Sequence, residues 1–281
     1  MALKIITDTS CDLPDEELKK HNIEMIPLKV TFDDGETYLD RIELSSAHFI
    51  KKMKSSKKLP KTAAPDPLTF IEYFEKGLRE AGEVLFISLA STLSSTYQTA
   101  QLASNMLGEK KVKIFDSLTA SLGTGIMAIK AANMSNMGLS SDTIIERLTR
   151  IRSSREVIFT LNTLENVVKG GRLSRIEGMA GTLFHIKPIF RGDHLGKIRV
   201  VEKVSGRKKA TSRLVAMVGE LAGESIKKRL IGISHVNCKD DAIRLGKEIE
   251  ERYNPENKII IAEMSATIGT YAGEGGLMVN F

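Results

Sequence analysis

A cluster of hydroxyl side chains is the feature of this sequence best placed to do chemistry. The segment "LASTLSSTYQTA", Leu89 to Ala100, lies at the end of the apolar run "EVLFISLA". Its serines and threonines are Ser91, Thr92, Ser94, Ser95, Thr96 and Thr99. The pattern predicts a buried strand that passes into a helix. In an open parallel sheet, ligands bind at the carboxyl ends of the strands, so these hydroxyls could hold a carboxylate without the fixed charge of arginine.

Two other roles are open for the same hydroxyls. Ser94 or Thr96 could cap the following helix, because serine and threonine are preferred there, and from this segment alone capping is favoured. Ser94 could instead be the nucleophile of a lipid or ester hydrolase, with His235 as the activating base. The GxSxG pattern of a nucleophile elbow is absent from the sequence, which counts against catalysis.

The remaining motifs exclude several classes of protein. The sequence has no GxGxxG after its first strand and no GxxxxGK[ST], so we do not expect a self-sufficient kinase or dehydrogenase. Its five histidines form no HxxxH or HExxH pair, and neither a metal nor a cofactor is expected. The basic runs "KKMKSSKK" and "GRKKATSR" lack interleaved aromatic residues, which favours solvated surface over nucleic-acid binding.

Composition and cysteine usage indicate a cytoplasmic protein. The chain has 281 residues, of which 42% are hydrophobic, enough for two ordinary domains. Cys11 and Cys238 lie far apart with no CxxC spacing, so neither a disulfide framework nor a thiolate metal site is expected. The start "MALKIITDTS" does not resemble a signal peptide, and no apolar run approaches the roughly 18 residues of a membrane span. The net charge of +6 is compatible with a solubilising surface.

Strand and helix patterns alternate along the first part of the chain. Strands are expected at "LKIIT", "IEMIPLKVTF", "EVLFISLA" and "KVKIFDS". Among the helices, one is capped by Ser45 or Ser46, one runs from Pro67 to a stop at Gly82, and one spans "SLTASLGTGIMAIKAANMSNMG". The stretch "SSKKLPKTAAPDP" is expected to be a loop. This alternation predicts an α/β domain with a mostly parallel sheet over residues 1–158.

The second half predicts a different kind of sheet. "EVIFTLNTL" and "HIKPIF" are expected as strands on either side of a helical segment broken by "KGGR", and "DHLGKIRVVEKV" as part of a hairpin. Strands at "LIGISHV" and "KIIIAEMS" alternate with two amphipathic helices, before the Gly-rich tail "IGTYAGEGGLMVNF". We therefore expect a mixed-sheet α/β domain over residues 159–281.

Five segments in order resemble the signature segments of the DegV family. They are "IITDTSCDLP", "LPKTAAPDP", "STLSSTYQTA", "VKGGRLSR" and "IGTYAGEGG", and the resemblance covers the whole chain. It implies a two-domain α/β protein that holds one long-chain fatty acid in a buried tunnel between the domains. It also implies a non-catalytic, FakB-type subunit of fatty acid kinase. A separate ATP-dependent kinase subunit would then phosphorylate the bound carboxylate, and any membrane contact would be transient.

The resemblance assigns the contacts to the carboxylate. The threonine of the family's first loop falls on Thr62, and the serine of its hydroxyl-rich segment falls on Ser94. A histidine usual near the carboxyl terminus is replaced by Tyr271, which can donate a hydrogen bond but cannot become a cation. Ala63 stands where a second hydroxyl is common, and Ser95 replaces a usual glycine. Thr62, Ser94 and Tyr271 are therefore the expected ligands of the carboxylate.

The resemblance also implies that a segment of the second domain lies near the mouth of the tunnel. Its GGR falls on Gly170, Gly171 and Arg172, where two glycines would let the backbone turn tightly and bring the guanidinium near the mouth. A helix stop followed by a solvated arginine is the structural alternative. Asp8, in the first signature segment, is expected to order its own turn and not to contact lipid. Glu274 stands where the family commonly has proline.

Overall fold

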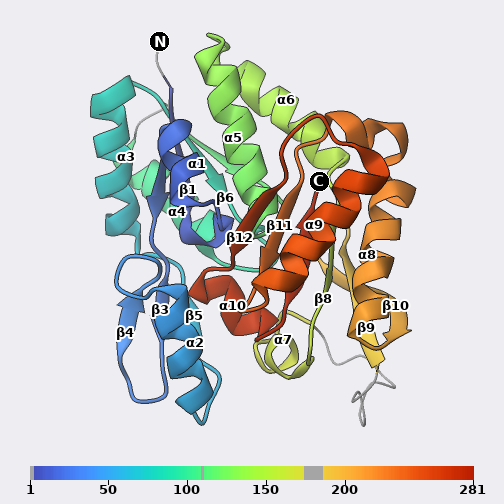
Figure 1. The fold of residues 1–281 in the computed structure, drawn as a ribbon. Helices are drawn as coiled ribbons and strands as arrows, with labels where there is room; N and C mark the ends of the chain where they lie inside the picture. Colours follow the sequence, from blue (N-terminus) through green and yellow to red (C-terminus); the bar gives the residue numbers. More distant parts are fainter. Residues whose placement is uncertain (1–2, 109–110, 174–185) are drawn as a thin grey trace.

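The computed structural model describes residues 3–108, 111–173 and 186–281. A four-stranded sheet forms its first part, with all strands parallel in the order β2-β1-β6-β7 (Figure 1). The strands are β1 (Lys4–Asp8), β2 (Ile23–Ile26), β6 (Val84–Ser88) and β7 (Val112–Asp116). The neighbouring helical elements are η1 (Thr9–Cys11), α1 (Asp15–Lys20), α3 (Pro67–Ala81), α4 (Thr96–Leu107), α5 (Leu122–Asn136) and α6 (Ser141–Ser153). The expected parallel α/β arrangement is confirmed.

Helix α3 shows how local sequence signals build this layer. The Asp66 side chain caps its amino end, Pro67 is its first residue, and Gly82 ends it at a φ of +75°. Its apolar face buries Phe70 and Phe74, which pack with α4 against one face of the sheet. Helices α5 and α6 cover the opposite face. The predicted start and stop of α3 are therefore confirmed.

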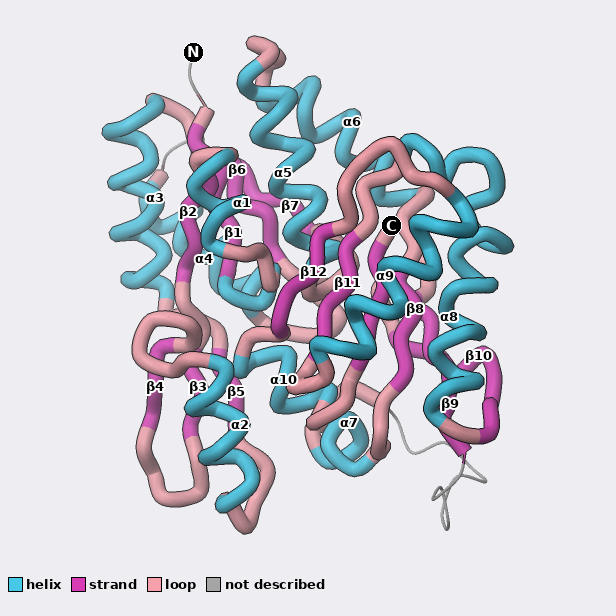
Figure 2. Tube along the Cα trace, in the orientation of Figure 1, coloured by secondary structure: helices cyan, strands magenta, loops and turns pink. Residues whose placement is uncertain are grey.

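A six-stranded mixed sheet forms the second part, in the order β10-β9-β8-β13-β11-β12 (Figure 2). Only the β11–β12 pair is parallel. The strands are β8 (Val157–Thr160), β9 (Ile186–Gly192), β10 (Ile198–Ser205), β11 (Gly232–His235), β12 (Ile260–Glu263) and β13 (Leu277–Asn280). The helical elements are α7 (Glu165–Lys169), α8 (Arg207–Ala222), η2 (Gly223–Lys228), α9 (Lys239–Tyr253) and α10 (Ala266–Ala272). Helices α8 and α9 pack on one face of this sheet, and α7 and α10 pack against residues of the other.

A small third sheet was not expected from the sequence. It has the order β4-β3-β5 and consists of β3 (Lys29–Thr31), β4 (Thr37–Leu39) and β5 (Lys61–Ala63). Helix α2 (Ser46–Ser55) lies beside it, capped by Ser45 as predicted. The single strand expected over residues 23–32 is in fact β2 and β3, in two different sheets, separated at Pro27, which has no N–H to donate to a ladder. The segment expected to be a loop contains β5.

Four further expectations differ from the structure or stay untested. Helix α5 begins at Leu122, five residues after the expected start, because Leu118 and Ser121 have positive φ angles and form a loop. The Gly-rich tail supplies α10 and β13, and β13 is an inner strand of the six-stranded sheet. The expected boundary after residue 158 falls inside β8, and this division stays a prediction. Part of the helical segment expected around "KGGR" lies outside the described residues.

No helix in the described part of the chain is long and apolar enough to cross a membrane.

Candidate functional site

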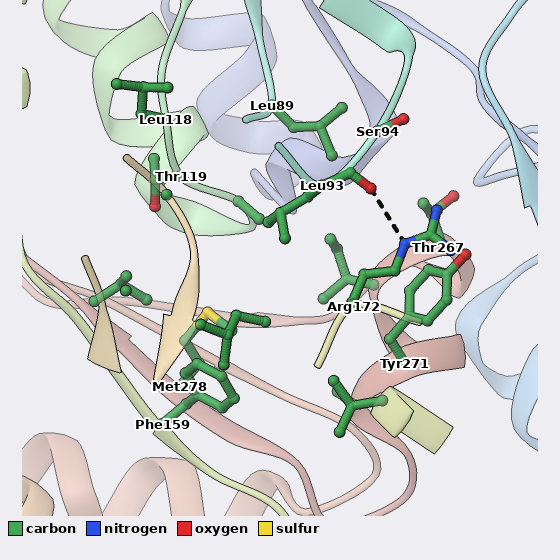
Figure 3. Close-up of a pocket in the computed structure, with 18 of the residues that line it drawn as sticks. Leu89, Leu93, Ser94, Leu118, Thr119, Phe159, Arg172, Thr267, Tyr271 and Met278 are labelled. Atoms are coloured by element: carbon green, nitrogen blue, oxygen red, sulfur yellow. Dashed lines mark hydrogen bonds between the residues drawn. The ribbon is translucent and has the colours of Figure 1, made fainter. Parts of the chain in front are cut away.

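A mostly apolar pocket lies between the two larger sheets. The space among its lining atoms amounts to about 870 Å³, including its opening to solvent. Leu89, Leu93 and Leu118 line it from the first part of the chain, and Phe159 and Met278 line it from the six-stranded sheet (Figure 3). Among the lining residues that the structure describes, Arg172 is the one charged side chain. The pocket can therefore bury an apolar molecule that carries a polar group at one end.

The polar end of the pocket brings together segments far apart in the sequence. Thr62 of β5 and Tyr271 of α10 lie in hydrogen-bond contact, with 2.5 Å between their hydroxyl oxygens. The guanidinium of Arg172 lies over the Tyr271 ring, 4.3 Å from its centroid, and its Nε donates a hydrogen bond to the backbone oxygen of Leu93 (Figure 3). Thr62, Ser94, Arg172 and Tyr271 all line the pocket, as the resemblance implied for a single site. Their role as ligands of a carboxylate stays a prediction.

Ser94 lies just before α4 and is not the N-cap of that helix, which is Ser95. Its Oγ lies 2.9 Å from Thr96 Oγ1 and accepts a hydrogen bond from the Thr96 backbone N–H, so it satisfies an N–H at the first residue of α4. It also lines the pocket. His235, its candidate base, lies on β11 and is not among the lining residues. The described residues therefore place a hydroxyl at the pocket, with no side-chain capping bond at Ser95 and without a serine–histidine pair.

Two glycines shape the turn before Arg172. A Cβ on Gly170 would collide with the Tyr271 ring, so only glycine lets the ring pack against this backbone. Gly171 has a φ of +72°, in the left-handed region that favours glycine. Arg172 Nη1 then donates to the Gly170 oxygen at 2.7 Å. This turn orients the guanidinium toward the polar end of the pocket.

Buried carboxylates hold the amino end of α10. The Asp40 carboxylate accepts hydrogen bonds from the backbone N–H groups of Ala266 and Thr267, both at 3.0 Å, and from the Thr267 hydroxyl at 2.6 Å. Asp12 accepts from the backbone N–H of Ser265 at 2.8 Å. Burial raises the pKa of Asp40 above its usual range and the pKa of Asp12 to about 7. These contacts position the helix that carries Tyr271.

Asp8 orders the turn after β1, as expected. Its carboxylate accepts a hydrogen bond from the Ser10 N–H at 2.9 Å, and it also accepts one from the Leu89 N–H at 3.2 Å. Burial raises the pKa of Asp8 to about 6. Asp8 therefore fixes the start of the segment that leads to Ser94.

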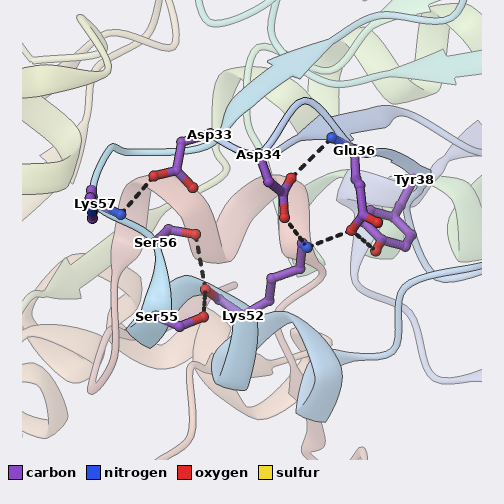
Figure 4. Close-up of polar contacts among 8 residues, drawn as sticks. All are labelled: Asp33, Asp34, Glu36, Tyr38, Lys52, Ser55, Ser56 and Lys57. Carbon is purple, nitrogen blue, oxygen red and sulfur yellow. Dashed lines mark hydrogen bonds and ion pairs between the residues drawn. The ribbon is translucent and has the colours of Figure 1, made fainter.

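Ion pairs hold the small sheet that carries Thr62. Lys52 of α2 contacts Asp34 at 2.5 Å and Glu36 at 2.6 Å, and Glu36 also accepts from the Tyr38 hydroxyl (Figure 4). These contacts join α2 to the β3–β4 hairpin. The carboxylates beside Lys52 hold its pKa above its ordinary value. Because β5 pairs with β3 along Lys29–Thr31, the position of Thr62 depends on this unit.

Comparison with known proteins identifies the family. The family described as "Uncharacterised protein, DegV family" matches residues 2–281. Protein DegV of Bacillus subtilis (strain 168) is 33% identical over 279 residues, which are 99% of this chain and 98% of that protein. The structure described as "Fatty Acid Binding of a DegV family Protein from Thermus thermophilus" has a TM-score of 0.92 at 26% identity, and the match covers 100% of this chain and 99% of that one. The structure of the Streptococcus pneumoniae Fatty Acid Kinase (Fak) B3 protein loaded with linoleic acid has a TM-score of 0.85 at 25% identity. The match covers 100% of this chain and 99% of that one. The chain therefore belongs to the DegV family.

Proposed function

We propose that this protein binds one long-chain fatty acid in the pocket. The observation that carries this proposal is the arrangement of the described lining residues: the hydroxyls of Thr62, Ser94 and Tyr271 and the Arg172 guanidinium gather at one end, and most of the other side chains are apolar. The acyl chain would lie among Leu93, Phe159 and Met278. The carboxylate would lie near Thr62 and Tyr271.

The energetics favour an acyl chain over a small polar ligand. Each methylene group removed from water contributes about 0.8 kcal/mol. On the order of a dozen methylenes would contribute about 10 kcal/mol before the costs of association. A few hydrogen bonds then suffice to orient the carboxylate.

Hydroxyl groups would provide those hydrogen bonds. The Thr62 and Tyr271 hydroxyls, which bond to each other, can turn their protons toward a carboxylate, and Ser94 can donate from the start of α4. Hydrogen bonds to a charged acceptor are stronger than neutral ones. Arg172 supplies the positive charge at this end of the pocket. Thr62, Ser94 and Tyr271 are therefore the proposed carboxylate ligands, with Arg172 at the mouth.

We further propose that the protein is a non-catalytic subunit that presents the carboxylate to a separate ATP-dependent fatty acid kinase subunit. The similarity to a structure described as a Fatty Acid Kinase B3 protein supports this role. The sequence itself carries no phosphate-binding motif for ATP. The partner would phosphorylate the carboxylate to an acyl phosphate in the cytoplasm, where ATP is available.

The Arg172→Ala variant tests the kinase step. Arginine matches the geometry of a phosphate group, so we expect Arg172→Ala to slow phosphorylation of the bound acid more than it weakens binding. Binding would be measured by fatty-acid titration, and phosphorylation by acyl phosphate formation with a fatty acid kinase subunit and ATP. Arg244→Ala, on the exposed surface of α9, serves as the control. Equal losses in both assays would place Arg172 in the binding site alone.

A further inference from the structure

The end of the pocket away from its polar group lies beside Leu118. Figure 3 shows Leu118 well separated from Arg172 and Tyr271. Gly196, in the turn between β9 and β10, lines the pocket too, and a Cβ on it would lie 2.7 Å from the Leu118 backbone oxygen. The turn therefore packs directly against Leu118. Leu118 and this turn, residues 193–197, form what we call the end wall, and the methyl end of a bound acyl chain would point toward it.

One guanidinium joins the segments that meet in the end wall. Arg155, between α6 and β8, donates through Nη2 to the backbone oxygens of Leu118 and Asp193, the latter at 3.2 Å. Its Nη1 donates to the Arg152 backbone oxygen at 2.9 Å. Leu118 follows β7 of the parallel sheet, whereas Asp193 follows β9 of the six-stranded sheet. Arg155 therefore ties the two parts of the chain together at this end of the pocket.

The backbone that Arg155 holds at Leu118 is unfavourable by itself. Leu118 has a φ of +51°, in the left-handed region that residues other than glycine seldom adopt. A residue keeps such a conformation only where its surroundings hold it from several sides. Here the Asp116 carboxylate accepts from the Leu118 N–H at 3.0 Å, and Arg155 binds the Leu118 oxygen. Arg155 is thus one of the groups that fix Leu118 in place.

The turn between β9 and β10 is also held by side chains. The Asp193 carboxylate accepts hydrogen bonds from the backbone N–H groups of Leu195 and Lys197, both at 2.9 Å. The Thr92 hydroxyl donates to the Leu195 backbone oxygen at 3.2 Å. The turn therefore contacts the segments after both β6 and β7, and Arg155 fixes it on the side of β7.

Charged groups lie directly beyond the end wall. Gly192 lines the pocket and also a surface groove, whose other lining residues include Arg155, Glu156 and Arg191. Glu156 and Arg191 form a two-point ion pair, at 2.6 and 2.7 Å. A methylene chain that passed the end wall would lie among these charges and would separate the Arg155 guanidinium from its carbonyl oxygens. Both effects are unfavourable.

We propose that Arg155 closes the pocket at the methyl end of the fatty acid and so sets the longest acyl chain that the pocket holds. This inference rests on the proposed fatty-acid binding. Arg155 is not among the described lining residues, so it acts through the Leu118 backbone and the β9–β10 turn. The rigid fork of a guanidinium can hold carbonyl oxygens of separate segments at once, which the single ammonium of lysine does less well.

The test is binding of saturated straight-chain acids, from dodecanoic to docosanoic acid, measured by displacement of a fluorescent fatty acid. In the unchanged protein, affinity should rise by up to about fourfold for each added methylene as far as one chain length, and then stop rising or fall. In Arg155→Ala the rise should continue to longer acids. The affinity for docosanoic acid, relative to the acid that the unchanged protein binds most tightly, should increase about tenfold or more.

Two further variants separate this role from general support of the fold. Arg229 Nη1 also donates to backbone oxygens, those of Ser154 at 2.7 Å and Phe281 at 3.4 Å, and Arg229 is not among the described lining residues. Arg229→Ala should therefore leave the dependence on chain length unchanged. Arg155→Lys keeps the charge without the fork and should give an intermediate dependence, and it provides the measurement if Arg155→Ala does not fold.

The shape of the chain-length dependence decides the outcome. The same dependence in both Arg155 variants as in the unchanged protein, even with all affinities lowered together, would overturn the proposed role of Arg155. An affinity of the unchanged protein that keeps rising through docosanoic acid would overturn it too. Failure of every acid in the series to bind the unchanged protein would contradict the proposed function, and this role with it.

Discussion

The smallest unit of the site is the contact between the hydroxyls of Thr62 and Tyr271. Tyr271→Phe keeps the ring beneath Arg172 and removes only the hydroxyl, so we expect fatty-acid binding to weaken by about 1–3 kcal/mol. Thr62→Val should have a similar effect. Because the two residues share a hydrogen bond, the double variant should lose less than the sum of the single losses. Titration calorimetry would measure all three affinities.

A matched tyrosine provides the control for this prediction. Tyr38 bonds to the exposed Glu36 and does not line the pocket, so Tyr38→Phe should leave the affinity unchanged. An unchanged affinity in Tyr271→Phe would instead show that the phenol does not reach the carboxylate.

Variants of the two glycines before Arg172 distinguish the effect of a steric clash from the effect of an unfavourable backbone conformation. Gly170→Ala places a methyl group against the Tyr271 ring, and we expect it to displace that ring and weaken fatty-acid binding about tenfold or more. At Gly171 there is open space, but the φ of +72° makes alanine unfavourable, so Gly171→Ala should cost about 1 kcal/mol of unfolding free energy. Binding titrations and urea unfolding of both variants would distinguish these effects. Equal affinities in the two variants would contradict the contact between Gly170 and Tyr271.

At the scale of helices and strands, the sequence predicts the helix ends and strands that depend on residues close together in the chain. Ser45, Pro67 and Gly82 mark helix ends that the structure confirms. Alternating apolar runs predict the parallel sheet, because crossover helices follow its strands.

Elements that depend on distant partners could not be predicted in the same way. Strand β5, which carries Thr62, has only three residues and forms through pairing with β3. Strand β13 consists of only four residues, "LMVN", after a Gly-rich stretch, and this short run alone does not predict a strand. It forms because it pairs with β8 and β11. Asp12 and Asp40 gave no local indication that they hold α10, because their partners are more than 200 residues away.

The contact between Asp12 and α10 has a consequence for stability. Burial raises the pKa of Asp12 to about 7 in the folded protein, against about 3.9 for an unfolded chain. Between about pH 3.9 and pH 7 the folded state therefore binds more protons than the unfolded state. For this reason Asp12 adds to the free energy of unfolding at low pH, and this addition is lost as the pH rises through about 7. From pH 5 to pH 8 its contribution to the unfolding free energy should fall by about 2–3 kcal/mol.

Asp12→Asn tests this pH dependence. Asparagine keeps an oxygen that can accept from the Ser265 N–H but cannot ionise. Urea unfolding at pH 5 and pH 8 should show a smaller loss of stability with rising pH in Asp12→Asn than in the unchanged protein. The difference between the two losses isolates Asp12, because the other titrating groups are shared. Identical losses would contradict a raised pKa for Asp12.

At the scale of the whole molecule, the pocket depends on the two larger sheets together. Leu89 and Thr119 follow strands of the parallel sheet, whereas Phe159 and Met278 belong to the six-stranded sheet. Neither sheet alone would enclose an acyl chain. The polar end likewise needs β5 and α10, which come from opposite ends of the sequence. A fatty acid bound here should therefore stabilise the packing of the two sheets against each other, because it binds only the folded arrangement.

The central claim is that one fatty acid fills this pocket, and native mass spectrometry of protein purified without added lipid tests it most directly. We expect the folded protein to carry the added mass of one long-chain fatty acid, and solvent extraction to release that acid in a one-to-one ratio. A folded protein that carries no fatty acid, and that takes up none when octadecanoic or a shorter saturated acid is added, would contradict the claim.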